Sequence, residues 1–313
     1  MKIVFMGSAE FGVPTLEKII EQHDLCALVS TPPRPQGRGL QLVESPIVSH
    51  ARSKKIEKII TPQDLRSQEL IETLSACGAD VFVVVAFRVL PKILFSIPRL
   101  GTVNIHASLL PFFRGPAPIQ RAIEAGATET GVTIFKIDEG VDTGAILLQE
   151  KTGIGPEETT PQLYERLSIL GADALVHALN GFSQGALLPV AQAASFSSRA
   201  PKLMKEEALI NWHEPARTLF NKIRAFKPFP GTFAYLDNKR LGIVWALPQG
   251  DDVSQNPGKI TRVGDTFFDV ECGRGIIRVH EVKPEGRKSM NVHDFLLGTK
   301  IKEGTSLTWM PAK

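Results

Sequence analysis

The chain has 313 residues, which is enough for two domains of ordinary size, and its 43% hydrophobic and 22% charged residues exclude a disordered or membrane-spanning chain. Its apolar runs are too short to cross a bilayer, and its first residues fit neither a signal peptide nor a transit segment. Three widely separated cysteines favour reduced thiols over a disulfide or a metal site. We therefore expect a cytoplasmic protein with no membrane partner.

The net charge of +3 is unevenly distributed. Residues 1–200 hold 18 of the 36 Lys/Arg and 20 of the 33 Asp/Glu, which leaves a net charge of −2 there and of +5 over residues 201–313. A basic second part favours a domain that meets a polyanion. A solvated surface with a modest lysine excess explains the composition equally well.

Apolar runs alternate with helical patterns through the first half, as in repeated β-α units. We predict strands over Lys2–Met6, Leu25–Ser30, Val81–Ala86, Val103–His106 and Gly131–Ile137. We predict helices over about Val13–Glu21, Pro62–Ala76, Ala117–Ala125 and Thr160–Leu179. The expected fold class is α/β, with a doubly wound, mostly parallel, Rossmann-like sheet that binds ligands at the carboxyl ends of its strands.

The periodicity stops between about Pro189 and Lys202, so we predict a first domain over residues 1–189, a linker over 190–205 and a second domain over 206–313. One helix is expected over about Glu214–Phe226. Short strands follow at Thr232–Leu236, Arg240–Ala246, Lys259–Val263, Thr266–Glu271 and Gly275–Val282. Five short strands joined by hairpin turns indicate a small β-barrel, with an OB-like barrel as the leading candidate.

Polar side chains with catalytic potential follow two of the predicted strands. Because side chains alternate along a strand, Asn104 and His106 lie on one face near its end, and the glycine-punctuated segment 138–144 can present Asp142 to the same crevice. An amide, an imidazole and a carboxylate suit attack of an amine on a carbonyl carbon, because the first two can stabilise an oxyanion and the last two can move a proton. No Ser or Cys nucleophile is needed, which favours direct transfer over an acyl-enzyme.

Each of these residues also has a simpler interpretation. His106 is compatible with a hydrogen-bonded core histidine, and Asp142 with an Asx turn. The turn over Met6–Phe11 follows a strand and opens a helix but lacks the GxGxxG pattern, so we expect no nicotinamide cofactor. The carboxylates of Asp138–Asp142 do not occupy calcium-loop positions and the histidines form no HxxxH cluster, so we expect no metal.

A long motif surrounds the candidate catalytic residues. It reads Asn104-x-His106-x-Ser108-Leu109-Leu110-Pro111-x-x-Arg114-Gly115, followed by Gly131-Val132-Thr133 and by Asp138-x-Gly140-x-Asp142-x-Gly144. This motif resembles that of the formyltransferases that use 10-formyltetrahydrofolate as formyl donor. The resemblance implies that Asn104, His106 and Asp142 are the catalytic set, and that the pterin lies between the loops 86–91 and 138–142. The folate-binding residues that it implies are Phe87, Val89, Leu90, Ser108, Leu109, Leu110, Pro111, Asp138 and Gly140.

Two features resemble the methionyl-tRNA formyltransferases within that superfamily. The loop Arg34-Pro35-x-Gly37-Arg38-Gly39 resembles the basic loop that wedges into the end of the acceptor stem, and the basic second part resembles their tRNA-binding barrel. The tRNA-binding residues implied are Arg34, Arg38, Lys202 and Lys205. Phe11 either contacts the methionyl side chain or packs in the core. The resemblance implies formylation of the α-amino group of initiator methionyl-tRNA for translation initiation, by a monomer with no protein partner.

Two other functions stay open at the level of the sequence. One is a folate-dependent formyltransferase for a small amine, such as a nucleotide sugar or glycinamide ribotide. The other is an RNA-binding module that keeps a degenerate transferase fold. Intact Asn104, His106 and Asp142 argue against the second.

Overall fold

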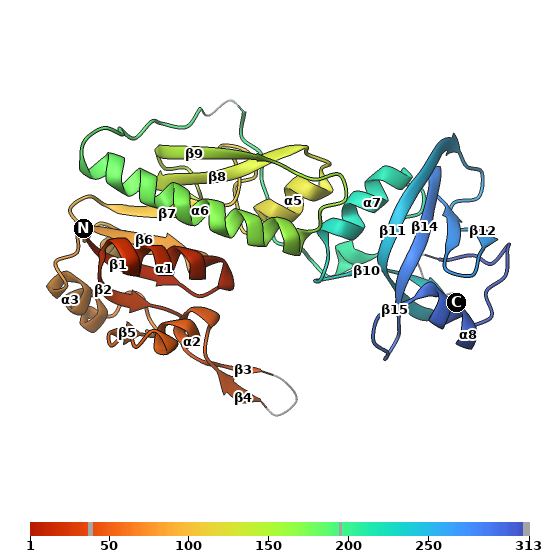
Figure 1. Cartoon of the computed structure of the whole chain (residues 1–313), viewed down its shortest axis with the longest axis horizontal. Coiled ribbons are helices and arrows are strands. Elements are labelled where there is room, and N and C mark those ends of the chain that lie inside the picture. Colours follow the sequence, from red (N-terminus) through yellow and green to blue (C-terminus); the bar gives the residue numbers. More distant parts are fainter. Residues whose placement is uncertain (37–39, 194–195, 309–313) are drawn as a thin grey trace. The chain divides into compact units, whose positions relative to one another are not determined.

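In the computed structural model, which describes residues 1–36, 40–193 and 196–308, the chain divides into two units (Figure 1). The first unit contains Met1–Pro118, Glu129–Gly153 and Tyr164–Ala200, and the second contains Ile119–Thr128, Ile154–Leu163 and Pro201–Lys313. Two short segments that precede Tyr164 in the sequence thus belong to the second unit. Over the described ranges, no helix is long and apolar enough to cross a membrane.

One seven-stranded sheet forms the framework of the first unit. Its strands, in spatial order, are β5 (Ile59–Ile60), β2 (Asp24–Val29), β1 (Lys2–Gly7), β6 (Val81–Val85), β7 (Thr102–His106), β8 (Glu129–Lys136) and β9 (Ile146–Gly153). Pairing is parallel from β5 to β7 and antiparallel from β7 to β9. The predicted mostly parallel sheet is therefore confirmed. The strand order reverses at β1, the position beside which such sheets bind ligands.

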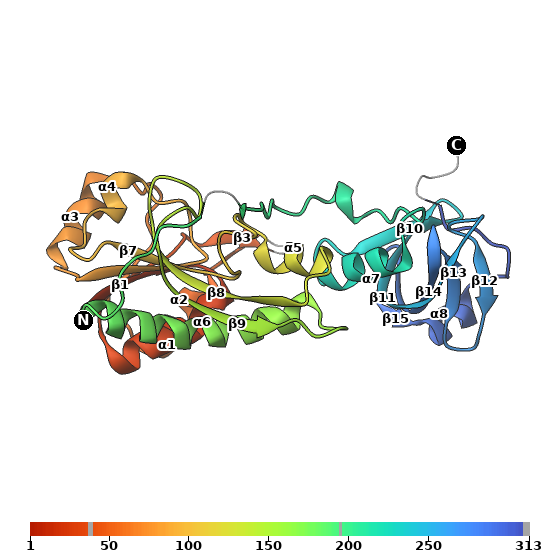
Figure 2. The same ribbon diagram turned by 90° about the horizontal axis from the view of Figure 1, so that it is seen from above.

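The central strands are buried on both faces. Val4 and Phe82 belong to a core cluster that includes Leu70 of α3 (Gln68–Ala76) and Leu94 of α4 (Lys92–Phe95). Phe5 points to the opposite face, where its ring approaches the start of α1 (Val13–Gln22). Figure 2 shows α3 and α4 on one side of the sheet and α1 and α6 (Thr160–Ser183) on the other. This two-sided burial explains why the strands read as continuous apolar runs without alternation.

Helices connect these strands, except for α6, which follows the last of them. They are α1 (Val13–Gln22), α2 (Pro46–Ser53), α3 (Gln68–Ala76), α4 (Lys92–Phe95), α5 (Pro118–Glu124) and α6 (Thr160–Ser183). The sequence did not predict α2, α4, β5, β9 or the hairpin of β3 (Arg34–Gln36) and β4 (Gln41–Val43).

The helix predicted over about Pro62–Ala76 is wrong in its first part, because α3 begins only at Gln68. Asp64 Oδ1 accepts a hydrogen bond from the backbone N–H of Arg66 at 2.8 Å. This local turn offers the backbone an alternative to the helix. The carbonyls of Pro62 and Gln63 accept hydrogen bonds from the Arg88 guanidinium instead of helical N–H groups.

The second unit is organised around an antiparallel sheet. Its strands are β10 (Thr232–Leu236), β11 (Lys239–Val253), β14 (Arg274–Pro284), β13 (Phe268–Glu271) and β12 (Ile260–Val263), with β15 (Met290–Asn291) paired to β14. The helices α7 (Ala216–Ala225) and α8 (Val292–Gly298) accompany it. Residues near Thr308 reach both edges of the sheet, because Thr308 bridges Tyr235 of β10 and Ser306 bridges Lys259 next to β12. The five predicted strands and the small barrel-like domain are confirmed.

Candidate functional site

Strand β7 presents two polar side chains at the edge where the carboxyl ends of β1, β6 and β7 meet. Asn104 and His106 lie on one face of β7, whereas Ile105 faces Gly171 of α6 on the other. Asn104 is half-buried, and within the part of the chain that the structure describes its carboxamide has no hydrogen-bond partner. Its amide group is therefore available to a ligand.

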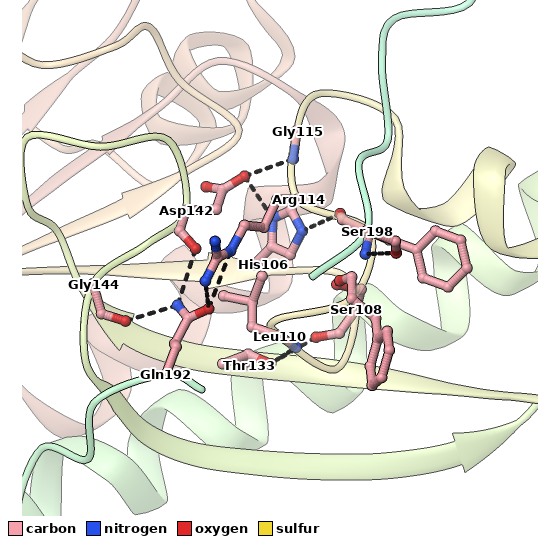
Figure 3. A network of polar contacts seen from close by, with 12 residues as sticks. His106, Ser108, Leu110, Arg114, Gly115, Thr133, Asp142, Gly144, Gln192 and Ser198 are labelled. Carbon is pink, nitrogen blue, oxygen red and sulfur yellow. Dashed lines mark hydrogen bonds and ion pairs between the residues drawn. The ribbon is translucent and has the colours of Figure 1, made fainter. Parts of the chain in front are cut away.

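Asp142 and His106 form the centre of the site (Figure 3). The imidazole is 6% exposed, and its Nδ1 lies 3.6 Å from Oδ2 of Asp142. On the other side of the ring, Nε2 lies 2.8 Å from the carbonyl oxygen of Phe113. A carbonyl can only accept a hydrogen bond, so Nε2 carries a proton. The nitrogen that can gain or lose a proton is therefore Nδ1, the one that faces Asp142.

Burial lowers the pKa of His106 below its ordinary value of 6.5, and the charge of Asp142 and the carbonyl of Phe113 act in the opposite direction. The imidazole is thus neutral in the resting protein near pH 7. A proton that arrives at Nδ1 would be stabilised by the carboxylate of Asp142. This combination is that of a group poised to accept and return a proton.

We expect the free energy of unfolding to fall as the pH drops below about 6.5. Because the folded-state pKa of His106 is depressed, the unfolded chain binds the proton first, so the stability present above the unfolded pKa is lost on acidification. This one group contributes a slope of at most about 1.4 kcal/mol per pH unit. Urea unfolding between pH 7.5 and 5 should show a shallower slope for His106→Gln than for wild type. The control is His177→Gln, at an exposed position of α6. Identical slopes for wild type and His106→Gln would contradict the prediction.

The loop that carries Asp142 has a tightly defined backbone. Asp142 has a φ of +53°, in the left-handed region, and its Oδ2 accepts a hydrogen bond from the N–H of Gly115 at 2.8 Å. A Cβ at Gly144 would lie 1.6 Å from the carbonyl oxygen of Lys136, so only glycine fits there. Asp138 Oδ1 accepts hydrogen bonds from the Gly140 N–H and the Thr143 hydroxyl. In the structure that oxygen of Asp138 thus stabilises the loop itself.

Thr133 of β8 holds the segment that follows β7. Its buried hydroxyl donates to the carbonyl of Ser108 at 2.6 Å and accepts from the N–H of Leu110 at 3.0 Å. Gln149 of β9 donates to the same hydroxyl and to the Leu110 carbonyl, both at 2.9 Å. The hydroxyl of Ser108 is also buried and donates to the Phe112 carbonyl. Internal hydrogen bonds therefore fix this segment before any ligand binds.

Thr133→Val should lower the free energy of unfolding by about 2–3 kcal/mol, because it leaves the buried N–H of Leu110 and the carbonyl of Ser108 without this partner at unchanged side-chain volume. Thr130→Val is a matched control on the same strand. Its hydroxyl is buried without a hydrogen-bond partner among the described residues, so its removal should be neutral or stabilise by about 1 kcal/mol. Urea unfolding measures both variants. Equal losses would mean that side-chain shape, not hydrogen bonding, holds this segment.

Three residues of the site were not predicted as site residues. Arg114, Gln192 and Ser198 surround the His106–Asp142 pair in Figure 3. Arg114 lies inside the motif, so the motif could have identified it as a site residue. Gln192 and Ser198 lie in the predicted linker, where a run of small polar residues carries no periodic pattern. Only the folded chain brings them to β7.

Phe11 and several of the predicted folate-binding residues differ in their exposure to solvent. Phe11 is 5% exposed and packs edge-to-face on Tyr164 at 5.1 Å, and Tyr164 accepts a hydrogen bond from the Phe11 N–H. Leu90 and Leu110 are buried in the first unit, Val89 is 87% exposed, and the Phe87 ring lies under the Arg88 guanidinium.

The predicted RNA-contacting residues lie at the surface where they are described. Arg34 is exposed on the hairpin strand β3, and Lys202 and Lys205 are exposed in the second unit. Arg38 lies outside the described residues.

Comparison with known proteins agrees with the family that the motif suggests. A family profile described as formyl transferase matches residues 1–179, and one described as formyl transferase, C-terminal domain, matches residues 202–300. The chain is 42% identical over 309 residues to a methionyl-tRNA formyltransferase of Syntrophus aciditrophicus, covering 98% of this chain and 99% of that protein. It is 40% identical over 309 residues to the enzyme of the same name from Geotalea uraniireducens, covering 98% of each.

Solved structures share the fold at lower identity. The sugar 3N-formyl transferase WlaRD, crystallised in the presence of dTDP and 5-N-formyl-THF, matches with a TM-score of 0.66 and 19% identity, over 92% of this chain and 99% of that one. A methionyl-tRNA formyltransferase from Clostridium thermocellum matches with a TM-score of 0.54 and 17% identity, over 91% and 98%. On the extent and identity of the sequence matches, the chain belongs to the formyl transferase family, among the methionyl-tRNA formyltransferases.

Proposed function

We propose that this enzyme transfers the formyl group of 10-formyltetrahydrofolate to the α-amino group of initiator methionyl-tRNA, and that it acts as a cytoplasmic monomer on the end of the acceptor stem. The observation that carries the proposal is the convergence of an available Asn104 amide with a buried His106 that faces Asp142 at 3.6 Å. Identity of about 40% to methionyl-tRNA formyltransferases along 98% of the chain supports the choice of acceptor.

In the first step, the neutral amine of the methionyl group attacks the formyl carbon, and negative charge develops on the formyl oxygen. Asn104 donates a hydrogen bond to that oxygen, and His106 adds positive charge beside it when Nδ1 is protonated. Donors that are already fixed before reaction stabilise such an oxyanion at little reorganisation cost. The segment held by Thr133 and the loop of Asp142 provide that rigidity.

The second step breaks the bond between the formyl carbon and N10 of the folate. The attacking amine must lose one proton and N10 must gain one, so the transfer is balanced without any external acid or base. Nδ1 of His106 and the carboxylate of Asp142 can take the proton from the amine and return it to N10. No covalent enzyme intermediate is needed, because the nucleophile belongs to the acceptor.

Basic residues of the second unit support an RNA acceptor. A groove of about 660 Å³ is lined by residues that include the cations Lys205, Lys227, Arg240 and Lys283. Two glutamates of the same groove partly offset this charge. Glu281 lies 3.9 Å from Lys227, and Glu285 accepts a hydrogen bond from the backbone N–H of Arg240. We propose that this groove, together with the basic hairpin strand that carries Arg34, contacts the phosphate backbone.

The experiment is formyl transfer from 10-formyltetrahydrofolate, measured side by side with methionyl-initiator tRNA, free methionine and glycinamide ribotide as acceptors. We expect transfer to the charged tRNA alone. The rate should fall steeply as the salt concentration rises, because each phosphate contact releases condensed counterions.

Other outcomes decide between the alternatives. Transfer to a small amine with a weak salt dependence would replace the proposed acceptor, and structural neighbours that formylate sugars make this the main rival. Binding of tRNA without turnover on any acceptor would point to an RNA-binding module.

A further inference from the structure

A segment that follows α6 returns to the active site. We call it the return segment, and it comprises Val190–Ala193 and Phe196–Ala200. Val190 exchanges two backbone hydrogen bonds with Ile146 of β9, each of 2.8 Å. The later part pairs with the chain around Arg114, whose N–H donates to the carbonyl of Ser198 and whose carbonyl accepts from the N–H of Ala200. The return segment is thus an integral part of the first unit.

Gln192 reaches from the return segment to the loop of Asp142. Its side-chain N–H groups donate to the carbonyls of Asp142 and Gly144 at 2.9 and 2.8 Å. Its side-chain oxygen accepts from the Arg114 guanidinium at 2.6 and 3.2 Å, which fixes the orientation of the carboxamide. Figure 3 shows Gln192 between Arg114 and the two carbonyls.

These contacts bear on the catalytic carboxylate because Asp142 has a left-handed backbone, with a φ of +53°. A residue with a Cβ leaves that region unless its surroundings hold it there. Among the described residues, two hydrogen bonds hold it: Gln192 donates to the carbonyl of Asp142, and the N–H of Gly115 donates to its carboxylate. Loss of the first would allow the backbone to relax and move the carboxylate relative to Nδ1 of His106.

Ser198 supports the partner of the other imidazole nitrogen, Nε2, through a contact with Phe113. Its hydroxyl accepts a hydrogen bond from the N–H of Phe113 at 2.8 Å, and Phe113 also has a left-handed backbone, with a φ of +57°. The carbonyl of Phe113 accepts a hydrogen bond from the Nε2–H of His106. The return segment therefore contacts the supports of both ring nitrogens.

From this geometry we propose that Gln192 and Ser198 are positioning residues for formyl transfer. Gln192 holds the Asp142 carboxylate toward Nδ1 of His106, and Ser198 holds the Phe113 carbonyl toward Nε2. The inference rests on the proposed function, to which it adds residues that touch neither substrate. A displacement of about 1 Å in a catalytic group can reduce the rate by about 10²-fold, so small changes in these supports should be visible in kcat.

The test compares Gln192→Leu, Gln192→Glu and Ser198→Ala with wild type in the formyl-transfer assay. We expect kcat to fall by about 10²-fold for both Gln192 variants and by about 10-fold for Ser198→Ala, with both KM values nearly unchanged. Gln192→Glu keeps an oxygen for Arg114 but loses the donors to the carbonyls of Asp142 and Gly144. Wild-type kcat for this variant would show that only the contact with Arg114 matters, and would overturn the role assigned to Gln192.

A second readout does not require turnover. Among the described residues, Asp142 is the charged group that acts on the imidazole, and it raises the pKa of His106, as does the Phe113 carbonyl. Arg114 is the charged side chain beside Gln192. Displacement of either support in Gln192→Leu or Ser198→Ala should therefore lower the pKa of His106, measured by NMR titration of the ring nitrogens. An unchanged titration in both folded variants would overturn the proposal, even if kcat falls.

Gln184→Leu is the matched control, because Gln184 is exposed beyond the end of α6. It should leave kcat and the titration of His106 unchanged. Thermal unfolding identifies any variant that does not fold. If the Gln192 variants do not fold, kcat and the His106 titration of Ser198→Ala still test the proposal. If wild type does not formylate methionyl-tRNA, the proposed function fails, whereas the NMR titration still decides whether the return segment positions His106.

Discussion

Asn104→Ala is expected to reduce kcat for formyl transfer by about 10²–10³-fold, the usual effect of removing one oxyanion donor. The Asn104 carboxamide has no hydrogen-bond partner among the described residues, so its loss leaves no protein group unpaired. The variant should therefore fold normally, and KM for both substrates should stay close to that of wild type. Steady-state kinetics with methionyl-initiator tRNA measures the effect.

Asn180→Ala is a suitable control for this variant, because Asn180 is exposed on α6. It should keep wild-type kcat. If Asn104→Ala instead raised KM for the folate with kcat unchanged, Asn104 would bind the ground state and would not stabilise the oxyanion. If kcat and KM both kept their wild-type values, Asn104 would have no role in the reaction.

Asp142→Asn should reduce kcat by about 10²–10³-fold, within the range found for general acid–base groups. The substitution keeps the side-chain volume and removes the charge that stabilises a proton on Nδ1 of His106 at 3.6 Å. It should also lower the pKa of His106, because the Asp142 charge raises it. The step in the pH–rate profile that belongs to the pair should therefore shift to lower pH, as measured from kcat between pH 5 and 9.

Asp173→Asn provides the control, since Asp173 forms a solvent-exposed ion pair with Lys18 at 2.8 Å on the surface of the first unit. It should leave both kcat and the pH–rate profile unchanged. Near-normal turnover of folded Asp142→Asn would exclude the carboxylate from proton transfer. A loss of kcat with an unshifted pH profile would mean that Asp142 only orients the loop.

The sequence predicted the elements whose residues follow a strong period or a continuous apolar run. The strands β1, β6, β7 and β10 agree with their predicted ranges to within a residue, and α1 does so as well. Burial dictates these patterns, because each core position must be apolar. The prediction failed where a side chain competes with the helix, as Asp64 does before α3. It also missed β9, in which half-buried and exposed residues dominate.

For the site, alternation along β7 was enough to place Asn104 and His106 on one face, and the glycine-punctuated segment 138–144 was expected to present Asp142 to the same crevice. The sequence alone thus determined the fold class and the family, because both depend on periodicity and on a long contiguous motif. The tertiary structure decided the surroundings of the His106–Asp142 pair. Gln192 and Ser198 are separated from His106 by more than 80 residues. Their hydrogen bonds to Asp142 and Phe113 arise only when the return segment pairs with Ile146 of β9 and with Arg114. Such contacts between isolated polar side chains and backbone carbonyls have no sequence period, so only the folded chain reveals them.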